Sequence, residues 1–79
     1  MSTASVDARG AKCPYPVIEL ARAAADAGPD STVELLCDDP VALSDVPAWC
    51  RMRGAQLVAV EDLGDHWRFR VLTGPAEHR

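Results

Sequence analysis

The sequence predicts a two-layer α/β (α+β) sandwich, in which two helices cover one face of a four-stranded mixed sheet. Two segments have apolar residues at helical spacing, four short segments have them at alternating positions, and glycine or proline separates the segments. Their order along the chain is βαβαββ. With 79 residues, the chain suits one small domain over residues 1–79, with a core at about 6–73 and short flexible ends at 1–4 and 74–79.

The first strand and the first helix flank a junction rich in proline. "SVDAR" predicts a short edge strand at about residues 5–9, which Gly10 ends. From Tyr15 onward, apolar residues recur with the spacing of a helix. Gly28 and Pro29 end this helix, because the glycine suits a left-handed cap and the proline cannot continue it.

The second strand and the second helix are predicted from the same kinds of sequence signal. "STVELLC" alternates apolar and polar residues, so residues 31–37 predict a strand with one buried face. Asp39-Pro40 and then the segment 44–47 are two successive helix-start signals. We therefore expect an irregular or 3₁₀-like opening and a regular helix to about Arg53. Its apolar face carries Val46, Trp49 and Cys50.

The last two strands form a hairpin. "QLVAVED" and "HWRFRVLT" alternate in character, and "LGD" between them has the length of a hairpin connection. In the final strand, Trp67, Phe69 and Val71 point toward the helices. Arg68 and Arg70 then decorate the open face of the sheet.

The charge of the chain limits its partners. The formal net charge is −4, which argues against a broad contact with nucleic-acid phosphates. No basic residue occurs between Arg22 and Arg51. The acidic residues of that segment form either a solvated flank or a docking surface for a basic partner: Asp26, Asp30, Glu34, Asp38, Asp39 and Asp45.

Several classes of site and location are not indicated. The first residues lack a signal-peptide pattern, and no apolar run approaches the length of a membrane span, so we expect a soluble cytoplasmic protein without a membrane partner. The two histidines, His66 and His78, have no recognisable ligand spacing, and no CxxC pair or glycine-rich phosphate loop occurs. We expect no metal, no cofactor and a monomer.

Three cysteines cannot all pair within one chain, so each is assigned separately. Cys37 is in phase with the buried face of its strand, and Cys50 lies on the apolar face of the second helix. Both positions favour packing in the core. Cys50 also suits a second thiol that resolves an oxidised or persulfurated partner.

Cys13 lies on no apolar stripe. It occupies the expected N-cap position with Pro14 as the first helical residue, although cysteine is not a favoured cap. A helix N-terminus stabilises a thiolate, and Lys12 acts in the same direction. Because Pro14 and Pro16 have no amide hydrogen, the Tyr15 N–H is the one donor expected near the sulfur. The alternative is that the prolines only start the helix.

A nucleophilic hydrolase needs a base beside its thiol, and neither histidine is placed by the sequence to serve Cys13. A thiol made reactive by its position alone suits thiol exchange, in which one sulfur accepts a group and hands it to another thiol. A single exposed thiol without a neighbouring partner favours a carrier over a dithiol oxidoreductase.

"KCPYP" at residues 12–16 resembles the Cys-Pro-x-Pro signature of the TusA/SirA-type sulfur carrier proteins, and residues 38–40 and 45–50 resemble the second block of that family. The resemblance covers about residues 6–73, and the βαβαββ order agrees with it. The position between the prolines is often acidic or aliphatic in the family, so Tyr15 departs from the pattern and bears on the choice of partner.

The resemblance implies a sulfurtransferase of the persulfide-carrier type. Cys13 would accept sulfane sulfur from a cysteine desulfurase or a rhodanese-like protein and relay it to an acceptor protein. Such relays serve transfer-RNA thiolation, molybdenum-cofactor assembly or sulfur oxidation. The supporting motif is Lys12, Pro14, Tyr15 and Pro16, and Lys12 would orient partners and steady the persulfide anion.

Two other functions are consistent with the residues. One is a non-catalytic interaction or regulatory module, which docks through the acidic segment or the face of Arg68 and Arg70. The other is a thiol-redox protein that uses Cys13 with Cys50.

Overall fold

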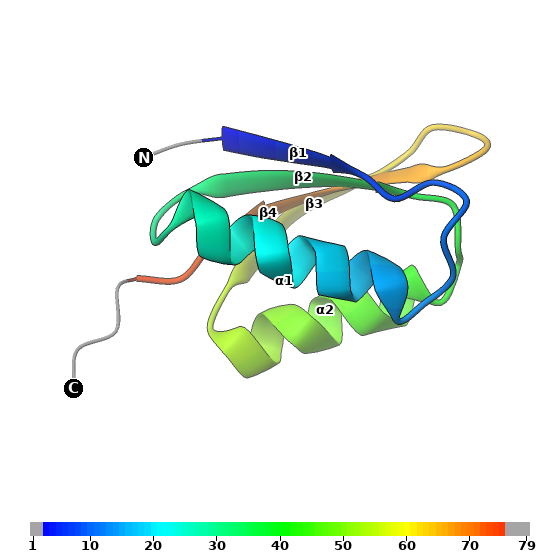
Figure 1. Cartoon of the computed structure of the whole chain (residues 1–79). Helices are drawn as coiled ribbons and strands as arrows, with labels where there is room; N and C mark the ends of the chain where they lie inside the picture. The colour runs from blue at the N-terminus through cyan, green and yellow to red at the C-terminus, as the bar shows by residue number, and fades with distance from the viewer. Residues whose placement is uncertain (1–2, 76–79) are drawn as a thin grey trace.

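The computed structural model describes residues 3–75 and confirms the predicted fold class, with both helices on one face of a four-stranded mixed sheet (Figure 1). The sheet has the order β1-β2-β4-β3, in which β1 and β2 are parallel and β4 is antiparallel to both of its neighbours. The elements are β1 (Thr3–Asp7), α1 (Tyr15–Ala27), β2 (Thr32–Cys37), α2 (Ala42–Arg53), β3 (Gln56–Asp62) and β4 (Trp67–Leu72).

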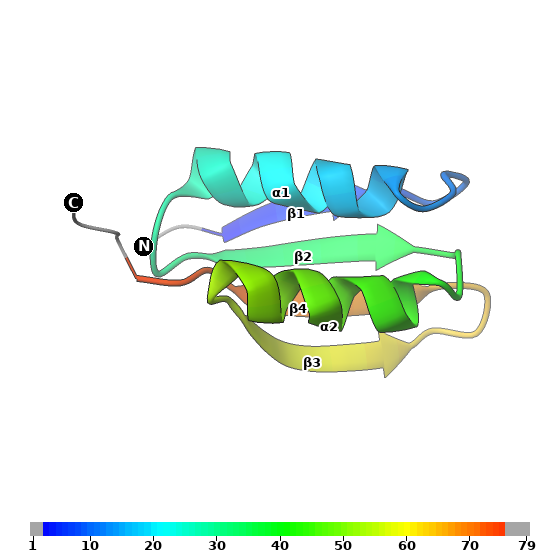
Figure 2. The same cartoon turned by 90° about the horizontal axis from the view of Figure 1, so that it is seen from below.

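This topology brings two loops to one end of the molecule. Because β1 and β2 are parallel, the loop from β1 to α1 and the loop from β2 to α2 leave the sheet at the same edge. Figure 2 shows the two helices side by side on the sheet, both beginning at that end.

The core lies between the sheet and the two helices. Leu20 from α1 and Val46 from α2 are fully buried against the apolar face of the sheet. That face is built from neighbouring pairs in the β2–β4 ladder, Val33 with Val71 and Leu35 with Phe69, all fully buried. The predicted inward direction of the residues of β4 is confirmed.

β1 lies two residues earlier than predicted. The strand was expected at 5–9 but spans Thr3–Asp7, where Thr3 pairs with Thr32 of β2. It ends because the Asp7 carboxylate accepts the backbone N–H of Arg9 at 3.1 Å and its guanidinium at 2.9 Å, which turns the chain. Of the flexible ends predicted at 1–4 and 74–79, residues 1–2 and 76–79 lie outside the described part of the chain. Thr3 and Ala4 belong to β1 and pair with β2, so the first flexible end was predicted too long.

α2 has the predicted tight opening. The N–H groups of residues 42, 43 and 44 each donate to the carbonyl three residues back, as in a 3₁₀ turn, before Asp45 makes the first α-helical bond to Val41. The second start signal, at 44–47, does not begin the helix. Ser44 is already helical, and Pro47 lies inside α2.

Candidate functional site

Carboxylates of the β2–α2 loop hold the loop that carries Cys13. The Gly10 N–H donates to both carboxylate oxygens of Asp38 at 3.0 Å, and the Cys13 N–H donates to Asp39 Oδ2 at 2.9 Å. The two loops lie at the end of the molecule where both helices begin (Figure 1). The backbone of Cys13 is therefore fixed by a side chain 26 residues further along the chain.

Cys13 is not the N-cap of α1, so the prediction of its capping position is wrong. The N-cap is Pro14, the helix begins at Tyr15, and Pro16 is its second residue. The Cys13–Pro14 peptide bond is cis. The Tyr15 N–H donates to the Lys12 carbonyl at 2.9 Å, forming a turn that precedes the helix. The one amide expected near the sulfur is thus directed to a carbonyl instead.

The electrostatic surroundings of Cys13 are acidic, which reverses the expected stabilisation of its thiolate. Burial raises the pKa of the Cys13 thiol from 9.0 to about 11, with a hydrogen bond to the Asp45 carboxylate as the second cause and the charges of Asp39 and Asp45 adding to it. Cys37 contributes in the same direction. The prolines supply no amide that would offset these carboxylates, so the helix start does not activate the thiol.

Asp39 combines burial with two hydrogen bonds. Its side chain is 8% exposed, and its oxygens accept the N–H groups of Cys13 at 2.9 Å and Val41 at 3.0 Å. These two bonds, in that order, lower the pKa of Asp39, and the charge of Lys12 acts in the same direction. Asp39 is therefore an ionised residue whose hydrogen bonds link the Cys13 loop to the start of α2.

The other two thiols lie in the core, as predicted. Cys37 and Cys50 are buried, and burial is the first cause that raises the pKa of each. The Asp39 N–H donates to Cys37 Sγ at 3.4 Å. Of the two, Cys37 is the one close enough to act electrostatically on Cys13.

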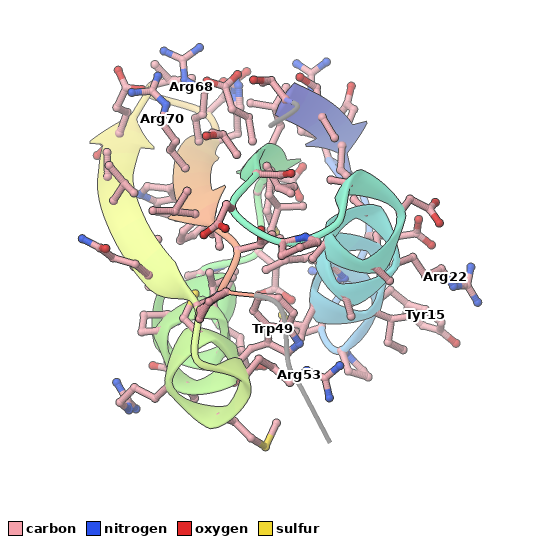
Figure 3. All side chains as sticks on the ribbon, turned by 90° about the vertical axis from the view of Figure 1, so that its left-hand side faces the viewer. Tyr15, Arg22, Trp49, Arg53, Arg68 and Arg70 are labelled. Atoms are coloured by element: carbon pink, nitrogen blue, oxygen red, sulfur yellow. The ribbon has the colours of Figure 1, made fainter. Side chains whose placement is uncertain are left out.

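The structure divides the supporting motif into surface and core. Lys12, Pro14 and Tyr15 are exposed, whereas Pro16 is fully buried. Figure 3 shows Tyr15 on the side of α1 that faces away from α2. The motif thus presents three side chains next to the thiol and uses the last to anchor the helix.

His66 is half-buried at the end of the β3–β4 turn, where its Nδ1 lies within hydrogen-bonding distance of Asp65. It is not among the groups that shift the pKa of Cys13. His78 lies outside the described residues. Within 3–75 no cluster of three or more potential metal ligands occurs, and no helix is long and apolar enough to cross a membrane.

Comparisons with known proteins show the family of the chain. The family model described as "Sulfurtransferase TusA" matches residues 4–73. The chain is also similar to a protein of Archaeoglobus fulgidus named "Putative sulfur carrier protein", with 36% identity over 66 residues, which cover 84% of this chain and 90% of that protein. The chain belongs to the TusA sulfurtransferase family.

Membership supports the role of a sulfur carrier for this TusA-family protein, with the transferase character that the family name states. The Cys-Pro-x-Pro signature is the segment described above, in which Cys13 lies before α1. The second block supplies Asp39, which accepts the Cys13 N–H at 2.9 Å, and Asp45, whose carboxylate raises the pKa of the thiol. The two sequence blocks are therefore two sides of one site.

Reasoning from the sequence missed the effect of Asp45 on the pKa of the Cys13 thiol. Asp45 was noted as part of a helix-start signal and of the second family block, but these are local features. Its position follows from α2 beginning beside the Cys13 loop, which requires the parallel pairing of β1 with β2. The run of acidic residues after Arg22 was the available signal.

The acidic segment does not form one continuous surface in the TusA-family fold. Asp26 lies near the C-terminal end of α1, whereas Asp45 lies in the first turn of α2, at the opposite end of the helix layer. The arginine face is also not free, because Arg68 Nε pairs with Glu61 at 2.8 Å and Arg70 Nε with Glu34 at 3.1 Å. Figure 3 shows both arginines on the side of the sheet away from the helices.

Proposed function

We propose that this protein accepts sulfane sulfur as a persulfide on Cys13 and relays it to an acceptor protein. The observation that carries the proposal is the accessibility of the sulfurs. Cys13 is partly exposed, whereas Cys37 and Cys50 are buried. A sulfur that is exchanged with another protein has to be reached by that protein, so Cys13 is the thiol that fits the role.

The reaction needs no oxidant or cofactor. The Cys13 thiolate attacks the outer sulfur of a donor persulfide, a new S–S bond forms at Cys13, and the S–S bond of the donor breaks. The donor leaves as a thiolate, and the proton lost by Cys13 is balanced by protonation of that thiolate. Delivery is the same exchange, with Cys13 as the leaving thiolate. The donor is a cysteine desulfurase or a rhodanese-like protein.

The acceptor belongs to one of the pathways that the family resemblance suggests, namely transfer-RNA thiolation, molybdenum-cofactor assembly or sulfur oxidation. The side chain that differs from the usual family motif, Tyr15, is 64% exposed next to Cys13. It is therefore placed to contact partners directly, which supports a part for this residue in the choice of acceptor.

Intact-protein mass spectrometry tests the proposal. After incubation with a cysteine desulfurase and cysteine, the wild-type protein should gain the mass of one sulfur atom, which dithiothreitol removes. Cys13→Ser should gain none, and Cys37→Ala serves as the matched control because it removes a buried thiol. The relay would be refuted if the wild-type protein gained no sulfur after the incubation, or if Cys13→Ser gained as much sulfur as the wild type.

The same variants separate the two alternative functions. A thiol-redox protein should form a Cys13–Cys50 disulfide under mild oxidation, and Cys50→Ala should abolish its activity. An interaction module should keep its biological role in the Cys13→Ser variant.

A further inference from the structure

We propose that the cavity between the C-terminal ends of α1 and α2 binds a small organic carboxylate, which accepts hydrogen bonds from the Arg53 guanidinium and the Trp49 indole N–H. The cavity lies at the opposite end of the helix layer from Cys13 (Figure 2). The 13 residues of α1 separate the two by about 20 Å. This site is therefore distinct from the thiol, and no step of the sulfur relay requires its ligand.

The cavity forms where three parts of the chain meet. The last turns of α1 and the turn after it, the end of α2, and the chain that follows β4 enclose a volume of about 280 Å³. Alanines of α1 supply the apolar part of the lining, and their small side chains leave the space open. Since a water molecule occupies about 30 Å³ in the liquid, the cavity suits a ligand of roughly nine or ten non-hydrogen atoms.

Hydrogen bonds fix the walls of this cavity. Thr73 is 8% exposed, and its hydroxyl accepts the Ser31 N–H at 2.8 Å and donates to the Gly28 carbonyl at 2.8 Å. The Thr73 N–H donates to the Ser31 carbonyl at 2.7 Å, and the Asp30 N–H donates to the Gly74 carbonyl at 3.2 Å. The turn after α1 is thus joined to the chain after β4. Walls that are already fixed in the free protein lose little conformational entropy when a ligand binds.

Trp49 brings a hydrogen-bond donor without a protein partner to the cavity. The residue is 8% exposed, lines the cavity, and donates no side-chain hydrogen bond to any of residues 3–75. In the same part of the chain, no side-chain nitrogen or oxygen is both fully enclosed and unpartnered, so the indole N–H is accessible. A buried tryptophan usually finds an acceptor for this group, and a ligand in the cavity would supply one.

Arg53 brings a positive charge that no carboxylate of the described chain neutralises. Four other arginines between residues 3 and 75 form ion pairs with carboxylates, namely Arg9, Arg22, Arg68 and Arg70. Arg53 forms none within those residues, and its exposed side chain lines the cavity. The lining is therefore apolar on one side and cationic on the other.

One ligand can reach both donors. Arg53 follows Trp49 by four positions in α2, so the two side chains lie on the same side of the helix, one turn apart. Figure 3 shows both between the C-terminal ends of the helices. A carboxylate has two acceptor oxygens and a charge opposite to that of Arg53, whereas an ammonium ligand would be repelled. Arg51 and Arg53 in the last turn of α2 offset the partial negative charge of the helix end.

Two-dimensional ¹H–¹⁵N NMR of the wild-type protein tests the site. The two tryptophans give separate indole signals, assigned with Trp67→Phe, and of the two only Trp49 lines the cavity. Phenylacetate should shift the Trp49 signal with a dissociation constant on the order of 1 mM, and its uncharged isostere phenylacetamide should bind about 10-fold more weakly. The Trp67 signal should not move. Equal affinity for acid and amide, or an equal shift of both tryptophans, would overturn the proposal.

Two arginine variants test the charge at the cavity. Arg53→Gln should weaken the binding of phenylacetate by about 10-fold, because the guanidinium no longer donates to the carboxylate. Arg51→Gln is the matched control, since it removes the same charge from the same turn of α2 at a residue that does not line the cavity. Both side chains are exposed, so both variants should fold. Wild-type affinity in Arg53→Gln, or an equal loss in both variants, would overturn the site.

Discussion

The alkaline stability of this protein should depend on Cys13. The unfolded chain releases the thiol proton near pH 9.0, whereas the folded protein keeps it to about pH 11. The contribution of this group to stability is complete below pH 9 and disappears as the pH rises to 11. Since one pKa unit corresponds to about 1.4 kcal/mol, the two units correspond to about 2 to 3 kcal/mol of unfolding free energy. That is a large share of the roughly 4 to 12 kcal/mol that stabilise a domain of this length.

Urea denaturation followed by tryptophan fluorescence measures this contribution. Under a reducing agent, the free energy of unfolding is determined at pH 8, 9, 10 and 11 for the wild type and for Cys13→Ser, which has no group titrating there. The wild type should lose about 2 to 3 kcal/mol more than the variant between pH 8 and 11. The other alkaline titrations, including those of Cys37 and Cys50, occur in both proteins and cancel. Parallel pH profiles would refute the acidic environment assigned to Cys13.

Two further substitutions test the supports of the site and of the fold. Asp39→Asn should increase the amide hydrogen exchange of Cys13, because one of the two N–H acceptors becomes a donor; unchanged protection would contradict the tie between the loops. Gly74→Ala should lower the free energy of unfolding by about 1 to 3 kcal/mol, since the added Cβ would lie 2.6 Å from the Gly54 carbonyl oxygen. Pro75→Ala, next to it and exposed, is the control and should leave stability nearly unchanged.

The fold was predictable because its signals are local. Alternation in "TVELLC" and "WRFRVL" and helical spacing after Tyr15 each depend on neighbouring residues, and each predicted element is present within about two residues. The boundary of β1 was missed because a side-chain contact between Asp7 and Arg9 ends the strand earlier than Gly10 would. Such competition between side chain and backbone is invisible to a periodicity argument.

The candidate site was only half predictable. Cys13 stood out because it fits neither a strand nor an apolar stripe, and the burial of the other two thiols followed from their phase. The direction in which the pKa of Cys13 shifts could not be predicted from neighbouring residues. It depends on Asp39 and Asp45, which are 26 and 32 positions away in the sequence. Local reasoning used the helix start and Lys12, the favourable groups nearby in sequence, and the carboxylates outweigh them in space.

The start of α1 directs no amide at the sulfur of Cys13, and two carboxylates act on its thiol. Together these features determine how reactive the thiol of this carrier is. A thiol activated by its own fold would react with any accessible electrophile between donor and acceptor. The surroundings of Cys13 instead favour the neutral thiol, because burial and the carboxylates of Asp45 and Asp39 raise its pKa. A neutral thiol reacts slowly with such electrophiles, so these surroundings would protect the thiol of a carrier between its donor and its acceptor.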